Sequence, residues 1–321
     1  MKKIRLKKNV KKFSLIGIVL LLFLSVGIYS SIKIYKQKEY EKTNEYKLIQ
    51  IGYSKDEINT ILNKFKDKEI EYILNSDLNQ NYLGLLNEKY FIYDNFYLYL
   101  NYLNENPNKT LRNIIEIINT KTNNEYYTNV EETDITKKEL MLANKYYYLD
   151  KNYEPENLVT IPTTYAWGEY GSKKITKETY DAFLNLWEDS NEQGFYLMVS
   201  SAYRTYDKQQ EVYDDYKNSR GTEYADSIAA RPGYSEHQTG YALDIFEKSS
   251  TQKDFHNSSS YAWLKENAHK YGFILRYPED KENITGYSFE SWHYRYVGIE
   301  VATYIYENNI TFDEYYAYFV K

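Results

Sequence analysis

The stretch SEHQTGYALDIF, residues 235–246, places an acidic side chain inside an apolar run that is typical of a buried strand. That acid is Asp244, which follows His237 by seven residues. A buried carboxylate is unfavourable unless a cation, a metal ion or hydrogen bonds compensate its charge. Gly240 lies between the two residues and lets the chain turn, so we expect both side chains to converge on one point.

A second strand-like stretch, ESWHYRYVG at residues 290–298, carries His293 with Glu290 three residues before it. The chain has four histidines and no cysteine, so a zinc site would have to use histidine, aspartate or glutamate. Two histidines and one carboxylate leave the fourth position of a tetrahedral zinc free for water, which is typical of a catalytic site. His237, Asp244 and His293 are therefore candidate zinc ligands.

Glu290 is the candidate general base, because a carboxylate that does not bind the metal removes a proton from water at such sites. In a regular strand, Glu290 and His293 would point to opposite faces, since the side-chain period is two. We therefore expect Glu290 in a loop or bulge just before the strand. The remaining histidines, His256 in a polar stretch and His269 on a predicted helix, are interpreted as solvated or structurally satisfied side chains.

Length and composition are those of a folding protein. The 321 residues are 42% hydrophobic and include 40 tyrosines, while the lack of cysteine excludes disulfide scaffolds, thiolate nucleophiles and iron–sulfur clusters. Residues 1–12 hold seven basic side chains and no acid, whereas the other 309 residues hold 33 basic and 46 acidic ones, a net charge of −13. A nucleic-acid-binding protein needs a basic footprint on its folded part, so this class is excluded.

Residues 13–32 form an uncharged apolar run, FSLIGIVLLLFLSVGIYSSI, directly after the basic cytoplasmic segment 1–12. A helix of this length crosses a hydrocarbon core of about 30 Å. A cleaved signal peptide would have a shorter apolar region and a small-x-small exit, for which Ser25-x-Gly27 is a poor match. We predict an uncut, single-pass anchor in the cell membrane, with the basic N-terminus in the cytoplasm and residues 33–321 outside it.

Residues 33–140 are predicted to form a helical stalk or packing region with no catalytic cluster. Ser54 and Glu57 match a capping-box pattern at the start of an amphipathic helix. Tyrosine-rich stripes in this region are interpreted as packing contacts, because burial of large apolar area is their commonest use.

The remaining region, 141–321, is predicted to be one mixed α+β domain. Pro155 and Pro162 bracket an extended stretch near its start, and helix and strand signals alternate beyond them. The predicted strands are 195–200, 241–246, 273–276 and 292–297, and the predicted helices include 206–216 and 261–271.

These stretches resemble the VanY-type D-alanyl-D-alanine carboxypeptidases, which are zinc peptidases of bacterial cell walls. SEHQTGYALD matches the family motif S-x-H-x-x-G-x-A-x-D, and ESWH matches E-x-W-H. The stretches SAYRTYDKQ at 201–209 and YGFILRYPEDKENITGY at 271–287 look like the same family, so the resemblance covers roughly residues 140–321.

The resemblance implies a compact, zinc D,D-peptidase-like α+β fold with a small antiparallel sheet and flanking helices. It also implies one catalytic zinc on His237, Asp244 and His293, with Glu290 as the catalytic base. Peptidoglycan stem peptides would then be the partner molecules of the extracytoplasmic region.

Four further residues are implied to bind substrate. Arg204 matches the arginine that holds the terminal carboxylate of the peptide, and its planar guanidinium suits that anion. Gln209, Ser235 and Tyr277 match pocket positions. Each of these three also has an ordinary structural alternative, namely an exposed helix face, a turn cap or a packing contact.

Together these features imply a membrane-anchored, zinc-dependent carboxypeptidase that removes the C-terminal D-alanine from stem peptides. An L,D-carboxypeptidase, a D,D-dipeptidase and a peptidoglycan endopeptidase are alternatives, because specificity depends on a few pocket contacts. A non-catalytic cell-wall binding protein on the same fold is a further alternative, although the complete set of ligands and base argues against it.

Overall fold

The computed structural model of the chain describes residues 2–168, 173–249 and 254–321, with side chains described from residue 17 onward. The side chains of the predicted basic segment 1–12 and the first four residues of the predicted span lie outside this description. The chain divides into two units, Met1–Lys89 and Tyr90–Lys321. Residues 90–140 therefore fold within the unit that also holds the predicted catalytic region.

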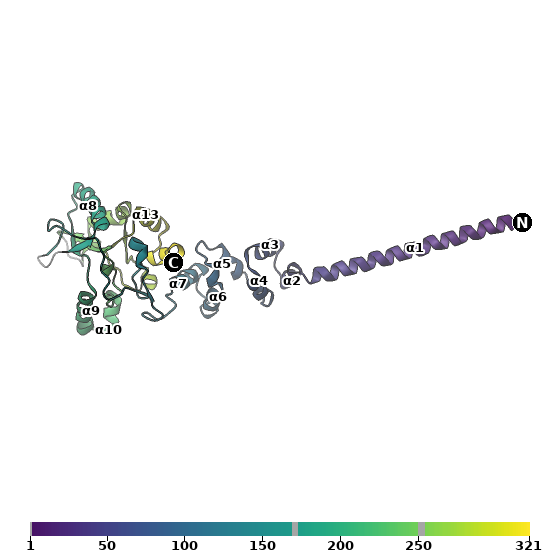
Figure 1. The fold of residues 1–321 in the computed structure, drawn as a ribbon, viewed down its shortest axis with the longest axis horizontal. Coiled ribbons are helices and arrows are strands. Elements are labelled where there is room, and N and C mark those ends of the chain that lie inside the picture. Colours follow the sequence, from purple (N-terminus) through teal and green to yellow (C-terminus); the bar gives the residue numbers. More distant parts are fainter. Residues whose placement is uncertain (1, 169–172, 250–253) are drawn as a thin grey trace. The chain divides into compact units, whose positions relative to one another are not determined.

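The first unit begins with α1 (Lys2–Glu41), a single continuous helix (Figure 1). Its segment Gly17–Glu41 is long and apolar enough to cross a membrane, with a mean hydropathy of 2.0 in its most apolar window. No part of that window is buried within the protein.

Four short helices complete the first unit around a small core. The capping box predicted at Ser54 and Glu57 is confirmed, because each side chain satisfies the other residue's backbone N–H at the start of α3. Leu48, Ile61 and Leu85 are fully buried where these helices pack. The four helices are α2 (Asn44–Ile51), α3 (Lys55–Lys64), α4 (Asp67–Leu74) and α5 (Asn81–Asn87).

The second unit is built around a four-stranded sheet in the order β5-β6-β8-β7, and all neighbouring strands are antiparallel. This confirms the predicted small antiparallel sheet. Each strand overlaps a predicted one: β5 (Leu197–Ser201), β6 (Ala242–Glu247), β7 (Phe273–Leu275) and β8 (His293–Tyr296).

Helices flank this sheet, as the resemblance implies. Figure 1 shows α8 and α13 toward the top of this unit and the adjoining pair α9 and α10 toward the bottom. The helices are α6 (Phe96–Glu105), α7 (Leu111–Asn119), α8 (Lys177–Glu192), α9 (Tyr206–Arg220), α10 (Thr222–Ile228), α11 (Ser259–Asn267), α12 (Glu282–Thr285), α13 (Ile299–Asn308) and α14 (Phe312–Phe319). Two short ladders pair β1 (Glu131–Glu132) with β2 (Tyr147–Tyr148) and β3 (Leu158–Thr160) with β4 (Lys174–Thr176).

One face of the sheet forms the main core of the second unit. Leu243 and Ile245 of β6 and Tyr294 of β8 pack there with buried apolar side chains of α8 and α11. Successive side chains on a strand point to opposite faces. Asp244 and His293, which alternate with these core residues, are therefore directed to the other face.

Candidate metal centre and substrate cleft

Asp244 and His293 stand directly opposite each other on β6 and β8. Opposed residues of an antiparallel pair project from the same face, with Cβ atoms about 4.5–5.5 Å apart. Their neighbours Leu243 and Tyr294 are also paired and lie in the core. The strand register therefore brings an acid and a histidine together, although they lie far apart in the sequence.

His237 reaches the same point from η3 (Glu236–Thr239), a short 3-10 helix that leads into β6. The helix ends at Gly240, whose φ of 73° lies in the left-handed region that favours glycine. A Cβ atom at Gly240 would lie 2.9 Å from the Cγ atom of Pro155, so the predicted turn also needs the small residue. Nδ1 of His237 lies 2.8 Å from the carbonyl oxygen of Ala202, an acceptor, which leaves Nε2 to face Asp244.

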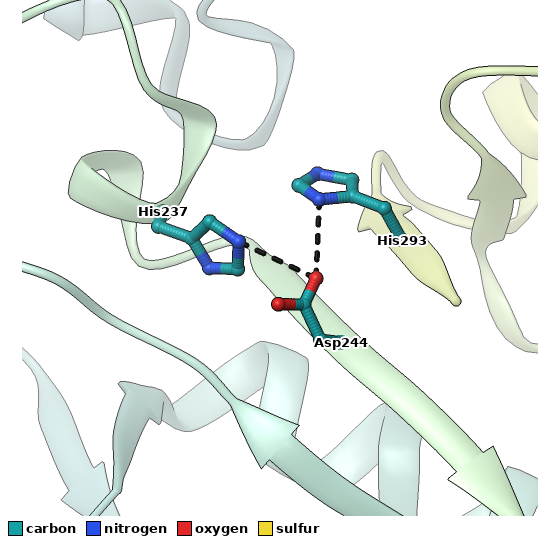
Figure 2. Close-up of side chains that lie close together, drawn as sticks. All are labelled: His237, Asp244 and His293. Carbon is teal, nitrogen blue, oxygen red and sulfur yellow. Dashed lines mark ion pairs between the residues drawn. The ribbon is translucent and has the colours of Figure 1, made fainter. Parts of the chain in front are cut away.

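The three predicted ligands meet at one oxygen atom. Nε2 of His237 lies 3.4 Å from Oδ1 of Asp244, and Nδ1 of His293 lies 3.2 Å from the same oxygen (Figure 2). One donor atom from each residue lies within 4.8 Å of the other two. All three side chains are buried.

This cluster fits the predicted single zinc ion. Two imidazole nitrogens and one carboxylate oxygen are the donor types that zinc prefers, and three protein ligands are typical of its catalytic sites. Oδ1 of Asp244 is buried without a hydrogen-bond donor in the described part of the chain. A buried carboxylate oxygen in this position is explained by a cation between it and the two histidines.

The carboxylates give the cluster a strongly negative electrostatic potential. Burial alone would raise the pKa of Asp244, but the two neighbouring histidines hold it well below its ordinary value. Burial also lowers the pKa of His237. At His293 burial acts in the same direction, but the carboxylates of Asp244 and Glu236 outweigh it and raise the pKa to about 9. The site therefore favours positive charge, as a divalent cation requires.

Glu290 lies in a loop three residues before β8 begins, as predicted. Its backbone N–H donates to the carbonyl oxygen of Tyr277 over 3.1 Å, and its Oε2 lies 3.6 Å from Nδ1 of His293. The side chain is only 14% exposed. Burial raises the pKa of Glu290 to about 8, and the negative charge of Asp244 adds to this effect. A carboxylate with a pKa near neutrality is suited to general acid–base chemistry.

Arg204 lies beside the cluster and is held by neighbouring side chains. Its Nη1 donates to Oε1 of Gln209 and its Nη2 to Oγ of Ser201, both over 2.8 Å. The backbone N–H of Arg204 donates to the carbonyl oxygen of His237 over 3.1 Å. The two side-chain contacts fix the guanidinium, and the backbone contact joins Arg204 to the segment that carries His237.

The other three predicted substrate residues also lie at the site. Gln209 is buried and donates to the carbonyl oxygen of Ala230 over 2.7 Å, in addition to its contact with Arg204. Oγ of Ser235 accepts from the backbone N–H of His237 over 3.3 Å, so this serine caps η3. The ring of Tyr277 lies 4.9 Å from that of His293, centroid to centroid. Their roles toward a substrate stay predictions.

A cleft of about 730 Å³ contains all these groups. It is lined by the three metal-site residues, by Glu290 and by the four predicted substrate residues. Side chains of α9 and α10 line it as well, among them Tyr216, Arg220 and Tyr224. The cleft is therefore larger than the metal site and offers surface for a longer molecule.

Sequence reasoning missed three residues at this site. Ser201, which holds Arg204, and Glu236, which lies 3.5 Å from His293, had no predicted role. An acid next to His237 was the available signal for Glu236. His256 was interpreted as solvated; it is exposed, but it also lines the cleft. His269 stacks on Tyr306 with ring centroids 4.0 Å apart, a structural contact.

The part of the chain that holds this site is similar to known proteins. The family model VanY, described as D-alanyl-D-alanine carboxypeptidase, matches residues 172–299. YodJ of Bacillus subtilis (strain 168), a carboxypeptidase by name, is 40% identical over 181 residues, which are 55% of this chain and 66% of YodJ. The bifunctional D-Ala-D-Ala dipeptidase and carboxypeptidase VanXYC of Enterococcus gallinarum is 34% identical over 57% of this chain and 95% of its own.

Among solved structures, the LD-carboxypeptidase LdcB is 38% identical, with a TM-score of 0.56 over 60% of this chain and 91% of its own. This chain spans 44% to 66% of the length of the first three curated relatives that it matches. The fold and the site thus define a zinc peptidase-like α+β domain. The chain belongs to the VanY family of D-alanyl-D-alanine carboxypeptidases.

Proposed function

We propose that this chain is a membrane-anchored, zinc-dependent D-alanyl-D-alanine carboxypeptidase that removes the C-terminal D-alanine from peptidoglycan stem peptides outside the cell. The observation that carries the proposal is that one cleft holds both the His237–Asp244–His293 cluster and Arg204. The first can hold a metal beside a scissile bond, and the second can bind the free carboxylate that defines a carboxypeptidase substrate.

Each residue of the site has a specific part in this mechanism. His237, Asp244 and His293 would hold the zinc ion, which when bound acts as a Lewis acid toward water and the scissile carbonyl. Oε2 of Glu290 accepts the proton of the attacking water molecule and then donates it to the nitrogen of the departing D-alanine. The side chain of Glu290 is only 14% exposed, which limits its contact with bulk solvent.

Arg204 positions the substrate. Its guanidinium binds the terminal carboxylate, and Gln209 and Ser201 hold it in place before the peptide arrives. Because the arginine is already oriented, less side-chain entropy is lost when the peptide binds. The distance from this anion site to the metal cluster then selects which peptide bond is hydrolysed.

The lining of the cleft favours a peptide over a free dipeptide. Tyr216, Arg220 and Tyr224 from α9 and α10 line the same cavity as the metal cluster. A free D-Ala-D-Ala would make little use of this surface, whereas the preceding residues of a stem peptide would contact it. This supports carboxypeptidase over dipeptidase activity.

An L,D-carboxypeptidase is the second candidate function. The LD-carboxypeptidase LdcB is 38% identical to this chain in sequence, and its solved structure matches with a TM-score of 0.56. The two activities differ in the configuration of the residue before the scissile bond, which a few pocket contacts decide.

Membrane anchoring is part of the proposal. The segment Gly17–Glu41 has the length and hydropathy of a span, and seven basic residues precede it. Basic flanks stay on the cytoplasmic side of a membrane. This orientation would place the cleft outside the cell, where the stem peptides are.

Mass spectrometry of defined muropeptides tests the activity. The full-length chain in detergent is incubated with a pentapeptide, a tetrapeptide and free D-Ala-D-Ala, with and without a chelator. We expect loss of one alanine from the pentapeptide, which the chelator abolishes and added zinc restores. Cleavage of the tetrapeptide alone would establish the second candidate, and no metal-dependent cleavage of any peptide would favour a binding protein.

A further inference from the structure

Glu236 is a buried acid that the mechanism above does not use. It precedes His237 on η3, and its side chain is completely buried. Its Oε1 accepts from Nε of Arg276 over 2.7 Å and from Nη1 of Arg295 over 3.0 Å. Both arginines are fully buried too. A buried ion cluster of this kind is weak evidence for stability alone, because the loss of hydration offsets its attraction.

The two arginines are themselves fixed by other groups. Arg276 donates to both carboxylate oxygens of Asp313 on α14, over 2.6 and 3.2 Å. Arg295 donates to the carbonyl oxygens of Glu139 and Met141, over 2.8 and 2.7 Å. Because each guanidinium is held from its far side, the carboxylate of Glu236 has little freedom to move.

The second oxygen of this carboxylate faces a metal-site histidine. Oε2 of Glu236 lies 3.5 Å from Nε2 of His293, slightly beyond hydrogen-bond length. Both atoms are buried, and neither has a hydrogen-bond partner among the described residues. Each is thus placed to become the partner of the other through a shift of a few tenths of an ångström.

We propose that Glu236 is a positioning residue that accepts a hydrogen bond from Nε2–H of His293 and so presents Nδ1 of His293 to the metal. This inference rests on the proposed zinc site. A metal-binding histidine usually donates its other ring N–H to a carboxylate or carbonyl, which fixes the tautomer and makes the donor nitrogen more basic. Oε1 of Glu236 is occupied by the two arginines, which leaves Oε2 to accept from His293.

The two histidines of the site are then held in opposite tautomers. At His237 the carbonyl oxygen of Ala202 accepts from Nδ1–H, and Nε2 faces Asp244. At His293 the carboxylate of Glu236 accepts from Nε2–H, and Nδ1 faces Asp244. His237 is oriented by the neutral carbonyl of Ala202, whereas His293 is oriented by the charged carboxylate of Glu236. Glu236 should therefore influence metal affinity more than the Ala202 carbonyl does.

Zinc affinity tests the proposal without relying on turnover. The dissociation constant of zinc is measured by competition with a chromogenic chelator, for the full-length chain in detergent and for Glu236→Gln. Glutamine keeps the size of the side chain but removes its charge. We expect zinc binding to weaken by roughly 10- to 100-fold, as for other residues that orient a metal ligand.

Asp313→Asn is the matched control. Asp313 binds the same guanidinium as Glu236 and is similarly buried, but the structure gives it no contact with a metal-site residue. We expect this variant to lower the melting temperature but to weaken zinc binding several-fold less than Glu236→Gln, because Arg295 still holds the carboxylate of Glu236. Equal loss of zinc affinity in both variants would mean that Glu236 acts only through general stability, and the proposal would be overturned.

A measurement on the wild-type protein decides the question if Glu236→Gln does not fold. The chain has only four histidines, so selective ¹⁵N labelling gives a simple imidazole spectrum. His256→Gln and His269→Gln assign the two signals outside the metal site. In the zinc-loaded protein we expect one remaining ring with Nδ1–H and one with Nε2–H; two rings with the same tautomer would overturn the proposal. Failure of the wild type to bind zinc would instead remove the proposed function itself.

Discussion

Gln209 holds Arg204 in place: its Oε1 accepts from Nη1 of the guanidinium over 2.8 Å, while its own amide donates to the carbonyl oxygen of Ala230. The amide is therefore fixed on both sides, and it fixes the arginine. Gln209, which was predicted to contact substrate, thus also contacts Arg204 directly. This contact explains how the anion site keeps its shape.

Arg204→Ala should remove recognition of a free C-terminus. A hydrogen bond to a charged group contributes about 1.5–3 kcal/mol, so kcat/KM for the free peptide should fall at least 10-fold. The same change should leave cleavage of a C-terminally amidated peptide nearly unaltered. Kinetics on the two peptides check this, and an unchanged preference for the free acid would contradict it.

Gln209→Ala should give a smaller effect of the same kind. Because it loosens Arg204 without removing the charge, we expect KM for the free peptide to rise several-fold while kcat changes less. Glu211, which is exposed on the same helix, provides the control variant Glu211→Gln. A fall in kcat alone would argue against the assigned role of Gln209.

Glu290→Gln should separate metal binding from turnover. Glutamine has the same shape but cannot accept the proton of water, and loss of a general base typically lowers the rate by about 10²- to 10⁴-fold. Zinc content, measured by atomic absorption, should stay near one ion per chain. If the variant keeps a rate close to that of the wild type, the base is another residue.

Alkaline pH should destabilise the fold through its buried tyrosines. Burial raises the pKa of Tyr127 and of Tyr287 above the ordinary value of 10. The unfolded chain ionises these groups near pH 10, whereas the folded chain keeps them neutral. The contribution of the two tyrosines to the free energy of unfolding is therefore complete below pH 10. As the pH rises above 10, the free energy of unfolding should fall.

Absorbance at 295 nm and circular dichroism, recorded together, check this. A set of tyrosines should ionise only as the secondary structure is lost, and the same set should titrate near pH 10 in denaturant. Complete tyrosine ionisation with the fold intact would contradict the prediction.

The absence of cysteine from the sequence makes the membrane orientation easy to test. Asn9→Cys and Lys42→Cys place one thiol on each side of the proposed span. In intact cells, an impermeant maleimide should label only the variant at position 42. Labelling at position 9 would reverse the orientation, and loss of the chain from the membrane fraction on alkaline extraction would refute the anchor.

Much of the metal centre was predictable because its signals are local. Asp244 interrupts an apolar strand, and Gly240 sits where only a small residue with positive φ fits. Such features follow from strand periodicity and turn chemistry, which a sequence displays directly. The strands around Asp244 and His293 were predictable for the same reason.

The role of Glu236 was not predictable in this way. Its partners Arg276 and Arg295 lie 40 and 59 residues further along the chain, and no spacing rule connects them. The same limit applies to residues 90–140, which were predicted as part of a stalk or packing region. Helix α7 contacts α14, although the two helices are far apart in the sequence of the second unit. This contact places the segment in the unit of the catalytic region.

The pairing of Asp244 with His293 has a consequence for how the protein matures. A slip of one residue between β6 and β8 would turn the histidine away from the acid, so the complete donor set exists only after the sheet has closed in its native register. Zinc uptake would then proceed only in correctly assembled molecules. The metal content of a preparation would thus serve as a direct gauge of the fraction of native protein.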